Sequence, residues 1–105
     1  MRSISITRPD DWHIHLRDRE YLARTVKDVS RYFGRAIVMP NLTPPVTSVE
    51  EAKKYLERIN SLLNSDSNFR PLMTLYLTEQ TPEEVIREAK PVSYTHLTLP
   101  TNREV

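Results

Sequence analysis

Two histidines separated by one residue, His13 and His15, are the side chains of this sequence best suited to hold a metal ion. Side chains alternate between the two faces of a β-strand, so a strand here would point both imidazoles the same way. Neutral imidazole is the commonest side-chain ligand of zinc, and catalytic zinc sites keep one coordination position open. The same spacing is also common by accident, so solvated or core histidines stay open as the alternative at this point.

Arg17 follows two residues after His15 and is expected on the same face as the two histidines. Its planar guanidinium suits a carboxylate or a phosphate. The sequence has no cysteine, which excludes a disulfide framework and a thiolate metal site. Any metal must therefore be held by nitrogen and oxygen ligands, with Arg17 as a candidate anion anchor.

Composition narrows the class of protein. The 105 residues allow one small domain with a modest core. The 15 basic and 14 acidic residues nearly cancel, so no charge pattern indicates binding to nucleic acid or to an anionic membrane. No apolar run is long enough to cross a bilayer, and the first residues do not resemble a signal peptide. We therefore expect a cytoplasmic protein.

Strands and helices alternate from residue 1 to about residue 90. Short apolar runs and helical spacing of apolar residues predict strands over residues 4–7, 12–16, 36–39 and 71–77, and helices over 20–33, 48–63 and 81–90. Alternation of this kind favours a parallel sheet, either a barrel or an open doubly wound sheet. No glycine-rich phosphate loop follows a strand, which disfavours a nucleotide-binding fold. A closed barrel needs eight strand–helix units and about 250 residues, so only its first three units would be present.

Sequence signals at the helix ends agree with these ranges. Gly34, the only glycine, is placed to cap the first helix, and Ser48 with Glu51 has the form of a capping box. Thr81 is expected as the N-cap of the third helix. The inward faces of the first two helices are predicted to be Leu22, Val26, Val29 and Phe33, and Ala52, Leu56, Ile59 and Leu63.

The last residues, 92–105, do not continue the helix pattern, and Pro91 ends the third helix. The codons GTC TCT TAT ACA CAT CTG ACG CTG CCG ACG encode residues 92–101, and this string resembles a transposase sequencing adapter. The adapter bases before it fit Pro91 as CCT. After residue 101, one adapter base and a sample index would fill three codons, and GTG TAG would encode Val105 and a stop. We therefore expect two parts: 1–91 from a gene, and 92–105 a non-native tail in which His96 is not a metal ligand.

Four segments together resemble one family: RPDDWHIHLRD at 8–18, GRAIVMPNL at 34–42, PPVT at 44–47 and PLMTLYLT at 71–78. They occur in order and resemble the N-terminal part of dihydroorotases, of the homodimeric bacterial type found also in some eukaryotes. The resemblance implies a (β/α)8 barrel of the amidohydrolase superfamily, so the fold class is α/β with the first three β/α units of an incomplete barrel.

The resemblance also implies an activity and a site. The family uses two zinc ions to interconvert N-carbamoyl-aspartate and dihydroorotate in pyrimidine biosynthesis. By position in the motif, His13 and His15 would hold the more buried zinc, and Arg17 and Asn41 would bind the substrate carboxylate. Asn41 follows directly after a predicted strand, where barrel enzymes place working residues, although a simple turn former after Pro40 is the alternative.

The rest of the family's catalytic set would lie beyond residue 90, so the fragment itself is expected to be inactive. The missing groups are a carboxylated lysine, two histidines and a catalytic aspartate. Lys90 belongs to the third helix and is assigned a surface role. Arg19 stands where the family often has glycine, which could alter the local backbone. Cobalt or manganese could replace zinc in such ligands. The remaining alternatives are another cyclic-amide hydrolase, such as a hydantoinase-like or allantoinase-like protein, and a non-catalytic fragment.

Overall fold

A computed structural model of the chain describes residues 2–89 and 96–98. Strands and helices alternate along it, as the sequence predicts. The elements are β1 (Asp10–Ile14), a 3-10 turn η1 (Arg19–Tyr21), α1 (Leu22–Tyr32), β2 (Arg35–Val38), α2 (Val49–Ser61), β3 (Arg70–Leu72), β4 (Thr74–Tyr76), α3 (Glu83–Ala89) and β5 (His96–Thr98). No helix within the described residues has both the length and the apolarity needed to cross a membrane.

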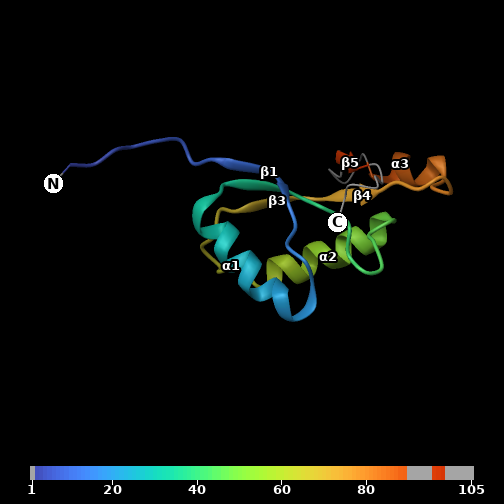
Figure 1. Ribbon diagram of the computed structural model, residues 1–105, viewed down its shortest axis with the longest axis horizontal. Coiled ribbons are helices and arrows are strands. Elements are labelled where there is room, and N and C mark those ends of the chain that lie inside the picture. The colour runs from blue at the N-terminus through green and yellow to red at the C-terminus, as the bar shows by residue number, and fades with distance from the viewer. Residues whose placement is uncertain (1, 90–95, 99–105) are drawn as a thin grey trace.

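The strands are parallel, which confirms the predicted sheet type. β2 lies between β1 and β3, with Asp10 opposite Arg35 and Arg35 opposite Arg70. β4 and β5 form a second parallel pair. Helices α1 and α2 lie on the same side of the three-stranded sheet (Figure 1). This arrangement is that of successive right-handed β/α crossovers.

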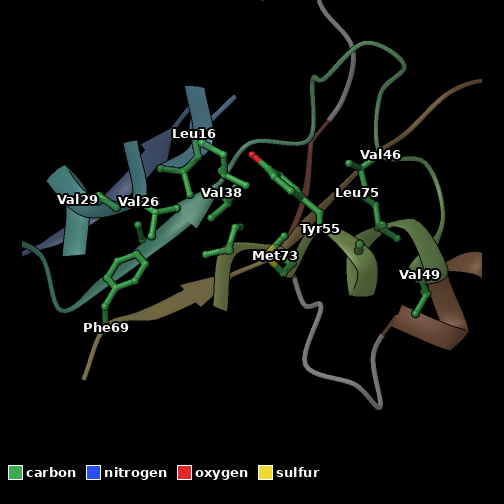
Figure 2. Packing of buried hydrophobic residues seen from close by; sticks show 14 of the residues in the cluster. Leu16, Val26, Val29, Val38, Val46, Val49, Tyr55, Phe69, Met73 and Leu75 are labelled. Carbon is green, nitrogen blue, oxygen red and sulfur yellow. The ribbon is translucent and has the colours of Figure 1, made fainter. Parts of the chain in front are cut away.

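The core lies between the sheet and its helices. Leu16 and Val38 meet Val26 of α1, while Tyr55 of α2 lies beside Met73 (Figure 2). The predicted inward positions of α1 are confirmed for Leu22, Val26 and Val29, which are buried, and Phe33 is partly buried against the same cluster. In α2, Ala52 and Ile59 are buried and Leu56 is partly buried, while Leu63, also partly buried, lies past the end of the helix at Ser61.

The helix ends differ in how well the sequence predicted them. Ser48 caps α2 as expected, because its hydroxyl accepts a hydrogen bond from the Glu51 N–H at 3.2 Å. Gly34 does not cap α1, since it lacks the positive φ that this role requires. Its N–H instead donates to the Pro9 carbonyl at 2.8 Å, and its own carbonyl accepts from Arg70 N–H at 2.9 Å. Gly34 therefore extends the sheet's hydrogen bonding.

The third helix also begins differently from the prediction. α3 starts at Glu83, and the Thr81 hydroxyl accepts a hydrogen bond from the Thr78 N–H at 2.8 Å. That bond stabilises the turn before the helix, so the expected N-cap role of Thr81 is wrong. Lys90 lies outside the described residues.

Two predicted strands need correction. Residues 4–7 are not a strand: Ile4 and Ile6 are 87% and 76% exposed, and the ladder of β1 with β2 begins at Asp10. The run predicted over 71–77 is divided into β3 and β4 at Met73. The Thr74 hydroxyl donates to the carbonyl of Val38, the last residue of β2, so a side chain takes the place of the next ladder bond.

Residues 96–98 form β5, a segment that the strand–helix pattern of the sequence did not include. Leu97 pairs with Leu75 of β4 in parallel register. A strand edge offers unpaired backbone N–H and C=O groups, and a β-prone segment can pair with it whatever its origin. The pairing with β4 is therefore no evidence that residues 96–98 belong to the native protein.

Candidate metal and substrate site

The imidazoles of His13 and His15 converge, as the spacing predicts. Their Nε2 atoms lie 3.2 Å apart, and the ring centroids are 5.1 Å apart at an interplanar angle of 65°. His13 belongs to β1, whereas His15 lies just past its end. Ile14 and Leu16 take the opposite side and contact the core; alternation also predicts Trp12 on that side, but Trp12 is 63% exposed. The pair therefore sits at the carboxyl end of β1, on the face away from the helices.

This geometry fits two ligands of one zinc ion. Two nitrogens each about 2.0–2.1 Å from zinc, at a tetrahedral angle, would lie about 3.3 Å apart. The 3.2 Å between the Nε2 atoms is close to that value. Within residues 2–89 and 96–98, no group of three or more histidine, cysteine or acidic side chains is placed to hold a metal. The described chain thus supplies two ligands, fewer than a catalytic zinc site uses.

Arg17 reaches the site by a turn rather than by strand alternation. Because β1 ends at Ile14, the expectation that Arg17 continues the face of the histidines is wrong. Arg17 has φ 62° and Arg19 has φ 54°, both in the left-handed region. That conformation costs a residue with a side chain about 1–2 kcal/mol. The resemblance places Arg19 where glycine is often found, and its left-handed conformation is one that favours glycine.

Asn41 is held by the loop that follows β2. The Pro40 carbonyl accepts hydrogen bonds from the N–H groups of both Leu42 and Val46, each at 2.9 Å. These bonds close a tight loop around Asn41, which is partly exposed. The Thr43–Pro44 peptide bond in this loop is cis. Asn41 is thus fixed at the carboxyl end of β2, next to the end of β1.

One pocket, of about 1130 Å³, brings Arg17 and Asn41 together. It lies between the loop after β1, the loop after β2 and helix α2. His13 and His15 are not among the residues that line it. The charged residues that line it are Arg17, Arg19, Lys54 and Arg58, and Asp18, Glu20 and Glu51.

The pocket is lined by four basic and three acidic side chains, and some of these are already paired or hydrogen-bonded. Arg58 is paired with Asp18, and the Glu51 carboxylate accepts a hydrogen bond from the Thr47 N–H at 3.3 Å. Arg17 has no ion-pair partner within residues 2–89. A carboxylate or phosphate entering the pocket would therefore find the Arg17 guanidinium available, and Asn41 lines the same pocket.

Sequence reasoning missed two side chains that hold this site. Tyr55 is 1% exposed, and its hydroxyl donates to the Arg17 carbonyl. Arg58 donates to both carboxylate oxygens of Asp18, at 3.0 and 2.9 Å. A signal was available for Tyr55: it lies three residues after Ala52 and four before Ile59, on the same apolar stripe, and a buried tyrosine needs a partner for its hydroxyl.

Taken together, the fold and the site define a class: the opening β/α units of a parallel α/β protein with a histidine pair and an anion pocket at the carboxyl ends of its strands. The dihydroorotase of Aliivibrio fischeri is 60% identical over 90 residues, and that of Coxiella burnetii is 58% identical over 90 residues. In both cases the match covers 86% of this chain and 26% of the relative. The chain is therefore a homologue of dihydroorotases, and it spans about a quarter of their length.

Solved structures agree with this relationship. Dihydroorotase from Campylobacter jejuni matches with a TM-score of 0.78 and 36% identity, over 90% of this chain and 27% of that chain. Dihydroorotase in complex with 5-fluoroorotic acid from Saccharomyces cerevisiae matches with a TM-score of 0.74 at 23% identity, which shows the shared fold, over 90% of this chain and 26% of that chain. No family model matches the chain.

These matches confirm the fold class predicted from the sequence, the first three β/α units of an incomplete (β/α)8 barrel. They also favour dihydroorotase over the hydantoinase-like and allantoinase-like alternatives.

Proposed function

We propose that this chain is the N-terminal part of a zinc-dependent dihydroorotase, which reversibly cyclises N-carbamoyl-aspartate to dihydroorotate in pyrimidine biosynthesis. The observation that carries the proposal is the 3.2 Å approach of the His13 and His15 Nε2 atoms at the end of β1. Sequence identity of 55–60% to proteins named dihydroorotase supports it.

Each candidate residue then has a role. His13 and His15 hold one of two zinc ions, and a bound zinc centre supplies an activated water and polarises the carbonyl that the water attacks. Arg17 and Asn41 bind the carboxylate of the substrate, since a guanidinium and an amide in one pocket match its oxygens. Anchoring the carboxylate orients the substrate relative to the metal.

The 105-residue chain alone has two metal ligands in its described part, so we infer that it is inactive by itself. The catalytic residues belong to the remainder of the intact protein. That protein acts on a small molecule in the cytoplasm, as a homodimer, without nucleic acid or membrane partners. Other divalent metals, such as cobalt or manganese, are accepted by the same ligand types.

We further infer that residues 92–105 are a translated sequencing adapter, which makes 1–91 the native part. The curated relatives match 86–90% of the chain, a share that leaves a remainder of about the tail's size. Sequencing reads across codon 91 test this inference. We expect gene sequence before that codon and adapter after it; reads in which gene sequence continues unbroken would contradict it.

A graft tests the proposed function. Residues 2–89 replace the matching segment of the full-length Aliivibrio fischeri dihydroorotase, which is 60% identical to this chain. We expect the graft to hydrolyse dihydroorotate when zinc is supplied, and the 105-residue chain to show no turnover. A graft that folds and takes up zinc but does not act on dihydroorotate would overturn the proposal. Appreciable turnover by the chain alone would overturn the inference that it is inactive.

A further inference from the structure

Three consecutive residues in the loop after β1, residues 16–18, are each held by a side chain from a helix. The Thr25 hydroxyl of α1 donates to the Leu16 carbonyl at 2.6 Å. The Tyr55 hydroxyl of α2 donates to the Arg17 carbonyl, and Arg58 of α2 holds the Asp18 carboxylate. The segment that carries the proposed substrate anchor is therefore fixed to the helix layer at every residue.

Tyr55 is built for this contact. Its ring is buried in the core, and in Figure 2 its hydroxyl end points towards Leu16, the neighbour of Arg17. Burial raises the pKa of the Tyr55 hydroxyl, and the nearby Asp18 carboxylate raises it further. The hydroxyl thus keeps its proton at neutral pH and acts as a donor. Its acceptor is a backbone carbonyl 38 residues away in sequence.

Arg58 acts beside Tyr55 on the same face of α2. Its guanidinium carbon lies 5.2 Å from the centre of the Tyr55 ring. The same guanidinium makes a two-pronged pair with Asp18, at 3.0 and 2.9 Å. Planar forked pairs of this kind fix orientation as well as distance. Tyr55 thus holds Arg17, and Arg58 holds the next residue, Asp18.

The backbone at Arg17 has an unfavourable conformation that these contacts stabilise. Arg17 has φ 62°, a conformation that residues with side chains rarely keep unless their surroundings enforce it. A change in φ at Arg17 would swing its side chain relative to Asn41, which stands on a separate loop. The anchors can act together on one carboxylate only if both loops keep their positions.

We propose that Tyr55 and Arg58 are positioning residues that hold Arg17 in its left-handed turn, so that its guanidinium meets the substrate carboxylate together with Asn41. This inference rests on the proposed function, because it assigns the two residues to the same substrate site. The proposed role does not require either side chain to contact the substrate.

The graft described above carries the test. Tyr55→Phe removes one hydroxyl and leaves the buried ring. We expect it to raise KM for dihydroorotate about three- to tenfold, the effect of one net hydrogen bond, with kcat little changed. Arg58→Lys, which keeps the charge but loses the fork, should raise KM in the same way. Tyr32→Phe and Arg24→Lys are matched controls, since Tyr32 is exposed and Arg24 makes an exposed pair with Asp28 at 3.6 Å.

A double variant separates positioning from general destabilisation. In a graft that already carries Arg17→Lys, adding Tyr55→Phe should cause little further rise in KM, because the side chain that Tyr55 positions has been removed. Unchanged KM in both single variants, or a multiplicative effect in the double variant, would overturn the positioning role. If Tyr55→Phe does not fold, Arg58→Lys decides by the same criteria. An unmutated graft without activity would instead overturn the proposed function, so the two failures are distinguishable.

Discussion

Asp10 and Arg35 face each other across β1 and β2, and they also form the ion pair that joins the two strands. They are register partners in the parallel ladder. Arg35 donates from two nitrogens to one carboxylate oxygen of Asp10, at 2.6 and 3.2 Å. Hydrogen bonding from Arg35 lowers the pKa of the Asp10 carboxyl. The pair lies at the opposite end of β1 from the histidines, where the ladder with β2 begins, and the register of that ladder shifts between Asp11 and Ile14.

This pair makes stability depend on pH. The folded-state pKa of Asp10 lies below the unfolded value of about 3.9, so its stabilisation is present above that value and is lost as pH falls through the folded pKa. Asp10→Asn should therefore lower the melting temperature at pH 6 by more than at pH 2.5. Asp28→Asn, in an exposed pair 3.6 Å from Arg24, is the control and should show little effect at either pH. An equal loss at both pH values in Asp10→Asn would contradict this account.

Substitution of Arg19 by glycine should not destabilise the fold, whereas glycine within helix α1 should. With φ 54°, it pays the left-handed penalty that glycine avoids. We expect Arg19→Gly to leave the free energy of unfolding unchanged or to raise it by up to about 1 kcal/mol. Lys27→Gly, within α1, should lower it by about 1 kcal/mol. Urea denaturation of both variants measures the contrast, and similar losses in both would show that the turn at Arg19 differs from the one described.

Ile59 should be sensitive to the loss of a single methylene. It is 0% exposed and lies in the cluster that joins α2 to the sheet. Ile59→Val should cost about 0.5–1.5 kcal/mol of unfolding free energy. Ile86→Val on α3, where the side chain is 41% exposed, should cost less than about 0.5 kcal/mol. Thermal melts of the two variants compare the sites directly, and an equal cost would argue against Ile59 as a core residue.

Zinc binding by the 105-residue chain should be weak and should depend on the histidine pair. His13→Ala should abolish the heat of zinc binding in a calorimetric titration, because it leaves one imidazole of the converging two. His96→Ala should leave that binding unchanged, since we assign His96 to the non-native tail. A loss of zinc binding in His96→Ala would contradict that assignment.

Local patterns predicted much of the fold, because strand alternation, apolar spacing and the Ser48 cap act over a few residues. They also predicted that His13 and His15 converge, since a short strand is enough for that. Local patterns failed where a contact with a residue distant in sequence determines where a strand begins or ends. β1 ends at Ile14 and Met73 interrupts the third strand run, where the Thr74 hydroxyl takes the Val38 carbonyl.

The site shows the same division. Its motif residues were visible in the sequence, but their placement was not. Arg17 reaches the pocket through a left-handed turn held by Tyr55, 38 residues later. No periodicity links two such positions. The pairing of Asp18 with Arg58 likewise depends on how α2 packs beneath the loop, which only the assembled fold determines.

The measurement that tests the central claim most directly is the rate of zinc-dependent dihydroorotate hydrolysis by the graft of residues 2–89, compared with the same graft carrying His13→Ala or His15→Ala. We predict turnover comparable to that of the intact relative, and its loss in either histidine variant while the graft stays folded. A folded graft without turnover, or turnover that survives removal of both histidines, would contradict the assignment of this chain as the zinc-binding start of a dihydroorotase.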